Sequence, residues 1–187
     1  MTRILGISGS LRRGSHNASL LRAAAEAADP DVELELYESL KQVPPYDQDD
    51  DVHPRPASVA RLNAAIADAD AVLFATPEYN ASIPGQLKNA IDWVSRPVAT
   101  NMLRNKPVAV VGASTGAFGA VWAQAELRKV LAALGARVLD FELPVPHAHT
   151  RFDEGGLTDD EIRARLADAM EALAEEIRQR ERAEVVA

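Results

Sequence analysis

The sequence predicts a doubly wound α/β domain: a five-stranded parallel sheet in the order 2-1-3-4-5, with helices on both faces. Three observations lead to this fold class. Short strand-like segments alternate with segments of helical periodicity along the whole chain. Most of the strand-like segments are continuously apolar, as strands buried on both faces of a parallel sheet are. The 187 residues contain no internal repeat, so we expect one domain over residues 1–187.

The expected strands are short and apolar. They lie at residues 3–8, 32–36, 71–76, 108–112 and 137–139. The second one alternates apolar residues with glutamates, which gives it one wet face and predicts an edge position.

The expected helices carry an apolar residue every three or four positions. They lie at residues 17–28, 56–68, 87–94 and 121–134, and a last helix begins near residue 158. Thr158 and Glu161 have the spacing of a capping box at the start of this last helix. Its charged end is expected to fray from about residue 180.

Two connecting regions are expected to be surface loops. Residues 37–56 contain four prolines and an acidic cluster, a pattern of solvated loop more often than of a metal or partner site. Residues 144–149 include His147 and His149. No third ligand accompanies these two histidines, so a metal site is not expected. Lys106 is expected to be an ordinary surface charge.

Composition excludes several classes of protein. The chain is 47% apolar and 26% charged, which is ordinary for a globular domain. Its net charge of -8 argues against a nucleic-acid partner. The absence of cysteine excludes disulfides, thiolate nucleophiles and cysteine-bound metals. No apolar run approaches the length of a membrane span and no signal peptide is recognisable, so we expect a cytoplasmic protein without membrane contact.

Three polar loops follow the first, third and fourth strands. We call residues 9–16 the first loop, residues 77–85 the second loop and residues 113–119 the third loop. In a doubly wound sheet, ligands bind at the carboxyl ends of the strands near the switch in strand order. The three loops are therefore expected to meet at one ligand crevice.

The first loop predicts a site for a phosphate monoester. It matches neither G-x-G-x-x-G nor G-x-x-x-x-G-K-[ST]. The hydroxyls of Ser10 and Ser15, the amide of Asn17 and the start of the following helix offer donors to one anion, and Arg12 adds charge-assisted hydrogen bonds. The alternative, that Ser15 or Asn17 only caps the helix, leaves Ser10 and Arg12 unexplained.

The other two loops suit a planar ring. Pro84 fits the first turn of the helix after the second loop, and a rigid loop with its amides presented can bracket a heterocycle. Residues 113–116 of the third loop carry no bulky side chain, so the backbone can approach a ring edge closely.

Two segments resemble a known family. GSLRRGSHN (residues 9–17) and PEYNASIPGQLKNAIDWVSR (residues 77–96) are similar to the NADPH-dependent FMN reductases, which include flavodoxin-like quinone, chromate and azo-dye reductases. The resemblance covers nearly the whole chain and implies a flavodoxin-like fold. It implies that the FMN phosphate is held by Ser10, Arg12, Ser15 and Asn17, with a weaker role for His16, whose position varies in the family. It places Pro77, Glu78, Tyr79 and Asn80 along the isoalloxazine ring, and Ser114 and Gly116 at its pyrimidine end.

The resemblance also implies the reaction. NADPH or NADH would pass hydride to N5 of FMN, and a quinone, chromate, an azo compound or free flavin would then be reduced. The cofactor carries this chemistry, so no catalytic side chain and no metal is expected. Family members are commonly homodimers or homotetramers. Two alternatives stay open: a flavodoxin-like electron carrier without NAD(P)H turnover, and a domain that binds a nucleotide or sugar phosphate.

Overall fold

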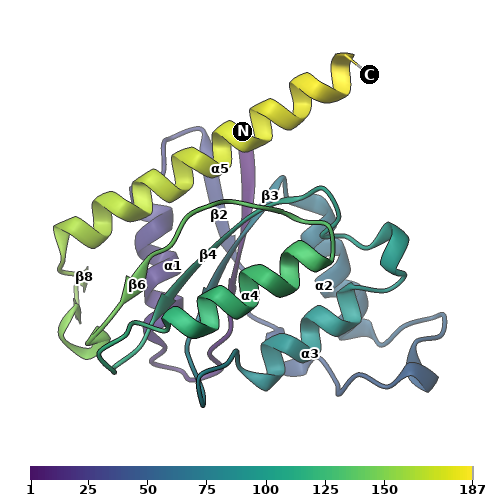
Figure 1. Cartoon of the computed structure of the whole chain (residues 1–187), viewed down its shortest axis with the longest axis horizontal. Coiled ribbons are helices and arrows are strands. Elements are labelled where there is room, and N and C mark those ends of the chain that lie inside the picture. Colours follow the sequence, from purple (N-terminus) through teal and green to yellow (C-terminus); the bar gives the residue numbers. More distant parts are fainter. Residues whose placement is uncertain (187) are drawn as a thin grey trace.

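A parallel sheet forms the middle layer of the computed structural model, which describes residues 1–186 (Figure 1). Its strands pair in the order β2-β1-β3-β4-β5, and all of these pairs are parallel. The predicted fold class, strand order and edge position of the second strand are confirmed. The five strands are β1 (Thr2–Ser8), β2 (Val32–Leu36), β3 (Ala71–Thr76), β4 (Pro107–Ala113) and β5 (Arg137–Val138).

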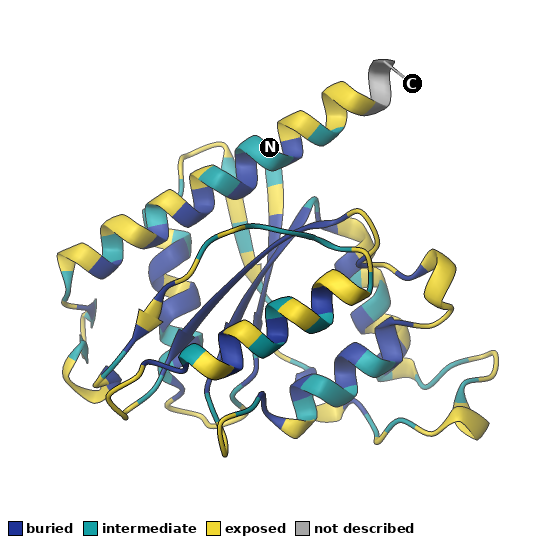
Figure 2. Ribbon diagram, in the orientation of Figure 1, coloured by how far each residue is buried: buried dark blue, intermediate teal, exposed yellow. Residues whose placement is uncertain are grey.

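Helices cover both faces of the sheet, as predicted. Successive strand residues point to opposite faces, so Ile4 joins one core and Leu5 the other. The core around Ile4 contains α1 and α5, and the core around Leu5 contains α2, α3 and α4. Every residue of β3 and β4 is buried (Figure 2). The helices are α1 (His16–Ala27), α2 (Ala57–Asp68), α3 (Gly85–Val94), α4 (Val121–Ala133) and α5 (Asp160–Val186).

A short sixth strand, β6 (Pro144–Val145), extends the sheet where we expected only loop. The chain leaves β5, returns to β4 and pairs Gly112 with Pro144 and Ala113 with Val145. The prediction was wrong because two residues are too few to show a strand period, and because the pairing partner lies far away in the sequence. A 3-10 turn, η4 (Ala148–Thr150), and a small hairpin of β7 (Phe152–Asp153) and β8 (Gly156–Leu157) follow.

The start of α5 also differs from the expected capping box. Asp159, one residue after Thr158, is the cap: its Oδ1 accepts hydrogen bonds from the N–H groups of Glu161 and Ile162, both at 3.1 Å. The Thr158 hydroxyl instead donates to the carbonyl of Arg151 at 3.1 Å. At the other end the helical backbone continues to Val186, past the residue near which we expected fraying.

Residues 37–56 form a long surface loop, as predicted, with two 3-10 turns, η1 (Leu40–Gln42) and η2 (Gln48–Asp50). Side chains of α3 hold this loop in place. The indole N–H of the fully buried Trp93 donates to the carbonyl of Pro44 at 2.9 Å, and Asn89 Nδ2 donates to the same oxygen at 2.8 Å. Within residues 1–186, no helix is long and apolar enough to cross a membrane.

Lys106 is buried, which corrects the expectation of a surface charge. Only 9% of its surface is exposed. Its ammonium group donates to the carbonyls of Ile66 at 2.7 Å, Ala67 at 3.3 Å and Ala69. These carbonyls lie at the C-terminal end of α2. Because the helix stops there, no N–H group of a following turn donates a hydrogen bond to them. Burial, followed by the nearby Arg180, lowers the pKa of Lys106.

Candidate functional site

The three predicted loops meet at the carboxyl ends of β1, β3 and β4, which are neighbours in the sheet (Figure 1, lower edge). Gly9 joins the first two loops. Its N–H donates to the carbonyl of Ala75 at 2.8 Å. A Cβ on Gly9 would lie 2.9 Å from Leu87 Cδ2 and 3.3 Å from Pro77 Cδ. A larger residue would require Leu87 and Pro77 to shift, so glycine favours this close packing of the first loop on the second.

The first loop offers a set of donors at the start of α1. Ser15 caps the helix, since its Oγ accepts from the N–H of Ala18 at 3.2 Å. This bond uses a lone pair and leaves the hydroxyl hydrogen able to donate. The N–H groups of His16 and Asn17 have no partner within the described residues 1–186. Ser10 is half-buried and Arg12 is exposed beside them. The donors and the helix dipole suit a compact dianion.

The Asn17 side chain joins the start of α1 to the third loop. It is 3% exposed. Its Nδ2 donates to the carbonyl of Ala113 and its Oδ1 accepts from the N–H of Ala113, both at 2.9 Å. The amide clamps the start of α1 to the third loop, and the backbone N–H and the second amide hydrogen of Asn17 remain for the predicted contact with an anion.

His16 lies between the first loop and the C-terminal hairpin. Its ring stacks on Phe152 with centroids 5.7 Å apart and an interplanar angle of 23°. Burial, then the positive charge of Arg12, then His149 lower the pKa of His16 from 6.5. The ring therefore favours the neutral form, and a bound anion would work in the opposite direction.

This lowered pKa predicts a pH effect on the stability of the FMN-free protein. Between the folded-state pKa and the unfolded value of 6.5, the unfolded chain binds a proton that the folded chain does not. Stability is therefore lost as the pH falls below about 6.5. His16→Phe keeps an aromatic stack and removes the titration. Urea unfolding at pH 7.5 and 5.5, both chosen for this comparison, should show the larger loss in the natural chain, and equal losses would contradict the assignment.

Glu78 in the second loop caps another helix. Its Oε2 accepts from the N–H groups of Trp122 at 3.0 Å and Ala123 at 3.1 Å, in the first turn of α4. A carboxylate is favourable at a helix N-terminus. The side chain is thus engaged within the fold, and only the backbone at Glu78 remains for the predicted contact with a ring.

The tip of the second loop is a tight turn. The backbones of Tyr79 and Ser82 bond to each other in both directions, at 3.0 and 3.1 Å. Asn80 and Ala81 between them have φ values of 53° and 59°. Asparagine tolerates this region, whereas alanine is strained there. The turn leaves Tyr79 53% exposed at the mouth of the site, directly after the buried Pro77 and the half-buried Glu78.

The third loop is braced by the segment that follows β6. The Ser114 N–H donates to the carbonyl of Val145 at 3.0 Å, and the Ser114 carbonyl accepts from Ala148 at 2.9 Å. The carbonyl of Gly116 accepts from the N–H of His147 at 3.1 Å. Ser114 Oγ accepts from Gly116 N–H at 3.1 Å. Both predicted residues of this loop lie at the expected end of the sheet, and His147 belongs to their support.

Gln124 is a structural residue of the site that the sequence reading missed. It is 1% exposed. Its Nε2 donates to the carbonyl of Gly119 at 3.0 Å, and its Oε1 accepts from the N–H of Leu143 at 3.3 Å. It ties the end of the third loop to the chain leading into β6. The sequence pattern could have indicated its burial, because Gln124 lies on the apolar face of α4 with Leu127 and Leu131.

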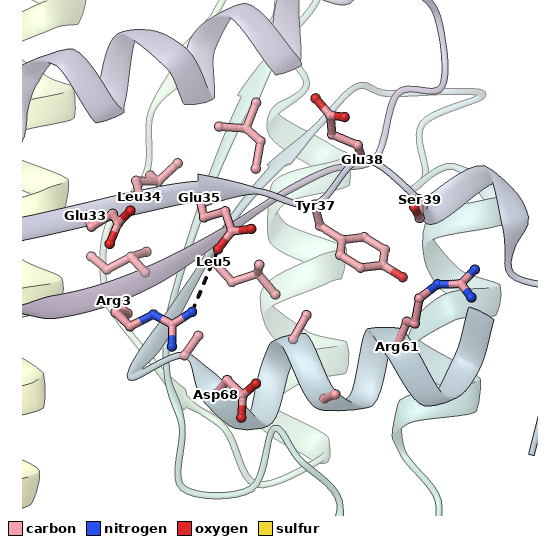
Figure 3. Close-up of a pocket in the computed structure, with 15 residues that line it drawn as sticks. Arg3, Leu5, Glu33, Leu34, Glu35, Tyr37, Glu38, Ser39, Arg61 and Asp68 are labelled. Carbon is pink, nitrogen blue, oxygen red and sulfur yellow. Dashed lines mark ion pairs between the residues drawn. The ribbon is translucent and has the colours of Figure 1, made fainter. Parts of the chain in front are cut away.

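A further concavity lies away from the three loops. It measures about 840 Å³ and runs between the edge strand β2 and α2 (Figure 3). Arg3 and Glu35 pair across it at 3.8 Å, and Asp68 and Arg61 stand on its α2 side. None of the predicted site residues lines it. A smaller cavity of about 320 Å³ adjoins the first loop and includes Ser10 and Arg12.

Comparison with known proteins identifies the family. The family model of the NADPH-dependent FMN reductases matches residues 2–150. The chain belongs to this family. It is 42% identical over 173 residues to an NAD(P)H-dependent FMN reductase from Pseudomonas aeruginosa, covering 91% of this chain and 92% of the relative. It is 38% identical over 180 residues to a 2-hydroxy-1,4-benzoquinone reductase from Burkholderia sp, covering 95% and 97%.

A solved structure agrees with this assignment. FerB from Paracoccus denitrificans, a flavoenzyme NAD(P)H:(acceptor) oxidoreductase, superimposes with a TM-score of 0.84 at 34% identity, over 96% of this chain and 99% of FerB. The predicted family is confirmed, and with it the flavodoxin-like fold, the oxidoreductase class, FMN as cofactor and NAD(P)H as reductant. The donors at the first loop fit the phosphate of FMN, since they can surround one monoester group.

Proposed function

We propose that this chain is an FMN-dependent NAD(P)H oxidoreductase that passes hydride to a quinone. The observation that carries the proposal is the meeting of the three loops, with an anion cradle at β1 and small-residue backbone at β4. Quinones are favoured among the acceptors because several relatives, including one from Escherichia coli, are quinone reductases. Chromate, azo compounds and free flavin are the further acceptors to assay.

The phosphate of FMN would be held at the start of α1. Ser10 and Ser15 would donate through their hydroxyls, and Arg12 through its guanidinium. The N–H groups of His16 and Asn17 would add two uncharged donors, and the helix dipole favours the negative charge. The Asn17 side chain would support this arrangement by fixing the helix start against Ala113.

The ring of FMN would lie against the second and third loops. The chain would hold the ring in place there. The backbone from Pro77 to Asn80 would contact one side of the ring, and Ser114 and Gly116 would contact the other. Bound FMN supplies the acceptance and release of hydride. The side chains therefore need no nucleophile or acid–base pair, and their task is to hold and orient.

Arg12→Ala is expected to weaken FMN binding by roughly 1.5–3 kcal/mol, the scale of a hydrogen bond to a charged group. This corresponds to a rise in Kd of about 10- to 150-fold. A fluorescence titration of the FMN-free protein measures it. Arg104→Ala is the matched control, because Arg104 is exposed and precedes β4, at the opposite end of that strand from the third loop. Equal affinity of the natural and Arg12→Ala proteins would refute the role of Arg12.

A flavodoxin-like electron carrier would bind FMN at the same loops but would not oxidise NAD(P)H. Steady-state oxidation of NADPH in the presence of a benzoquinone separates the two functions. Turnover supports the reductase, and FMN binding without turnover would contradict it.

We also propose a homodimer or homotetramer in the cytoplasm. Phe118 is 63% exposed and Trp122 48% exposed, and their rings contact edge to face with centroids 4.9 Å apart. Exposed aromatic groups of this size mark interaction surfaces. Since Phe118 lies in the third loop and Trp122 in the first turn of α4 behind it, a partner subunit on them would lie beside the site. Sedimentation as a monomer at micromolar concentration would contradict this proposal.

A further inference from the structure

A second cationic site adjoins the first loop. The cavity of about 320 Å³ lies between the first loop, α1 and the segment that follows β2. Its lining contains four cations and a single carboxylate, Glu38. The chain as a whole has 28 acidic residues against 20 basic ones, so this concentration of positive charge is local. The four cations are Arg12, Arg13, Arg22 and Lys41.

These cations form no ion pair among the described residues, whereas several arginines elsewhere on the surface do. Arg128 pairs with Asp140 and Glu142, and other arginines form similar pairs. Among residues 1–186, the side chains of Arg13, Arg22 and Lys41 form neither ion pairs nor hydrogen bonds. Like charges that converge without a counter-ion repel one another, and a bound anion would relieve this repulsion.

The cavity shares Ser10 and Arg12 with the phosphate site proposed at the start of α1 but extends beyond it to Arg22 and Lys41. Arg22 is six residues beyond His16, which places its Cα about 9 Å along the helix axis from the first helical residue. Lys41 comes from η1, after the edge strand β2. An FMN phosphate held at the helix start by Ser10, Arg12 and Ser15 would leave Arg13, Arg22 and Lys41 for a second anion.

We propose that this cavity binds the 2′-phosphate of NADPH and so favours NADPH over NADH. A phosphate monoester is the group that distinguishes the two nucleotides, and guanidinium groups bind it through paired hydrogen bonds. Leu21, Leu36 and Leu40 also line the cavity, with Tyr37, and these apolar surfaces suit the adenosine to which the phosphate is attached. This inference rests on the proposed function.

The strand order gives the cavity a suitable place for a dinucleotide. The ring of FMN is proposed at the ends of β3 and β4, whereas the cavity lies on the β2 side of β1. From the middle of β3 and β4 to β2 is two and a half strand spacings, or about 12 Å. An extended NADPH molecule spans this distance, with its nicotinamide at the ring and its adenosine in the cavity.

The test compares the FMN-loaded natural enzyme with the double variant Arg22→Ala/Lys41→Ala, and Arg104→Ala serves as the control. With benzoquinone as acceptor, the double variant should lose roughly 10- to 100-fold in kcat/KM for NADPH and less than about 2-fold for NADH, because charge-assisted bonds to the 2′-phosphate are lost. Its affinity for FMN should stay unchanged. Equal losses for both nucleotides, or no loss, would overturn the proposal.

Two further readouts separate the possible failures. If the cations serve the phosphate of FMN, the double variant will bind FMN more weakly and keep its preference for NADPH once loaded, which would overturn the proposal. Calorimetry with adenosine 2′,5′-bisphosphate and with 5′-AMP tests the cavity without turnover. Tighter binding of the bisphosphate, lost in the double variant, supports the cavity even if neither nucleotide is oxidised; in that case only the proposed function fails. Equal binding of the two probes contradicts the cavity alone.

Discussion

Asn17→Ala is expected to lower the free energy of unfolding by about 2–4 kcal/mol, because it leaves a buried N–H and a buried C=O without partners. Both groups belong to Ala113, and each now bonds to the Asn17 amide at 2.9 Å. The same change frees the start of α1 from the third loop. We therefore also expect weaker binding of FMN, since the phosphate and ring contacts would no longer be held in one arrangement.

Urea unfolding and an FMN titration measure the two effects of this substitution. Ser19→Ala is the matched control, because Ser19 lies on the same helix, is half-buried, and its hydroxyl forms no hydrogen bond within the described part of the chain. Its unfolding free energy should stay within about 0.5 kcal/mol of the natural value. A natural-like stability of Asn17→Ala would show that the clamp contributes little.

Lys106→Met is the second large expected effect, a loss of about 2–4 kcal/mol in the free energy of unfolding. The ammonium group donates hydrogen bonds to three carbonyls at the end of α2, where burial leaves water little access. Methionine fills a similar volume but donates no hydrogen bond, so those carbonyls lose their partner. The cost of burying the charge offsets part of the gain, which keeps the estimate below the sum of three full bonds.

Lys129→Met serves as the control for this substitution, because Lys129 is an exposed residue of α4. Chemical denaturation should show a change within about 0.5 kcal/mol for the control. The FMN affinity of folded Lys106→Met should remain natural, since Lys106 directly precedes β4 at the end away from the loops. Equal unfolding midpoints for the two methionine variants would contradict the capping role.

Local patterns predicted most of the fold because they depend on neighbouring residues alone. β3 lies at the predicted residues, and α1 begins one residue from the predicted start. The failures depend on distant partners. β6 exists because residues near 144 meet the end of β4, and Asp159 replaces Thr158 as the cap while the Thr158 hydroxyl bonds to Arg151.

In the candidate site too, features set by neighbouring residues were predicted, and features set by distant partners were not. The three loops could be found because small and polar residues follow buried strands. The Asn17 side chain was assigned to the phosphate and Glu78 to the loop along the ring, yet both side chains bond to backbone groups of other segments. Asn17 gave a signal, since it stands in the apolar stripe of α1 three and four residues before Leu20 and Leu21. Glu78 gave none, because its partner Trp122 is 44 residues away.

The most direct test of the account is the absorption spectrum of the purified protein after incubation with FMN and removal of free flavin. The account predicts a bound flavin spectrum whose absorbance falls on anaerobic addition of NADPH and returns when a benzoquinone is added. A protein that stays colourless after incubation with FMN, or a bound flavin that NADPH and NADH leave unchanged, would contradict it.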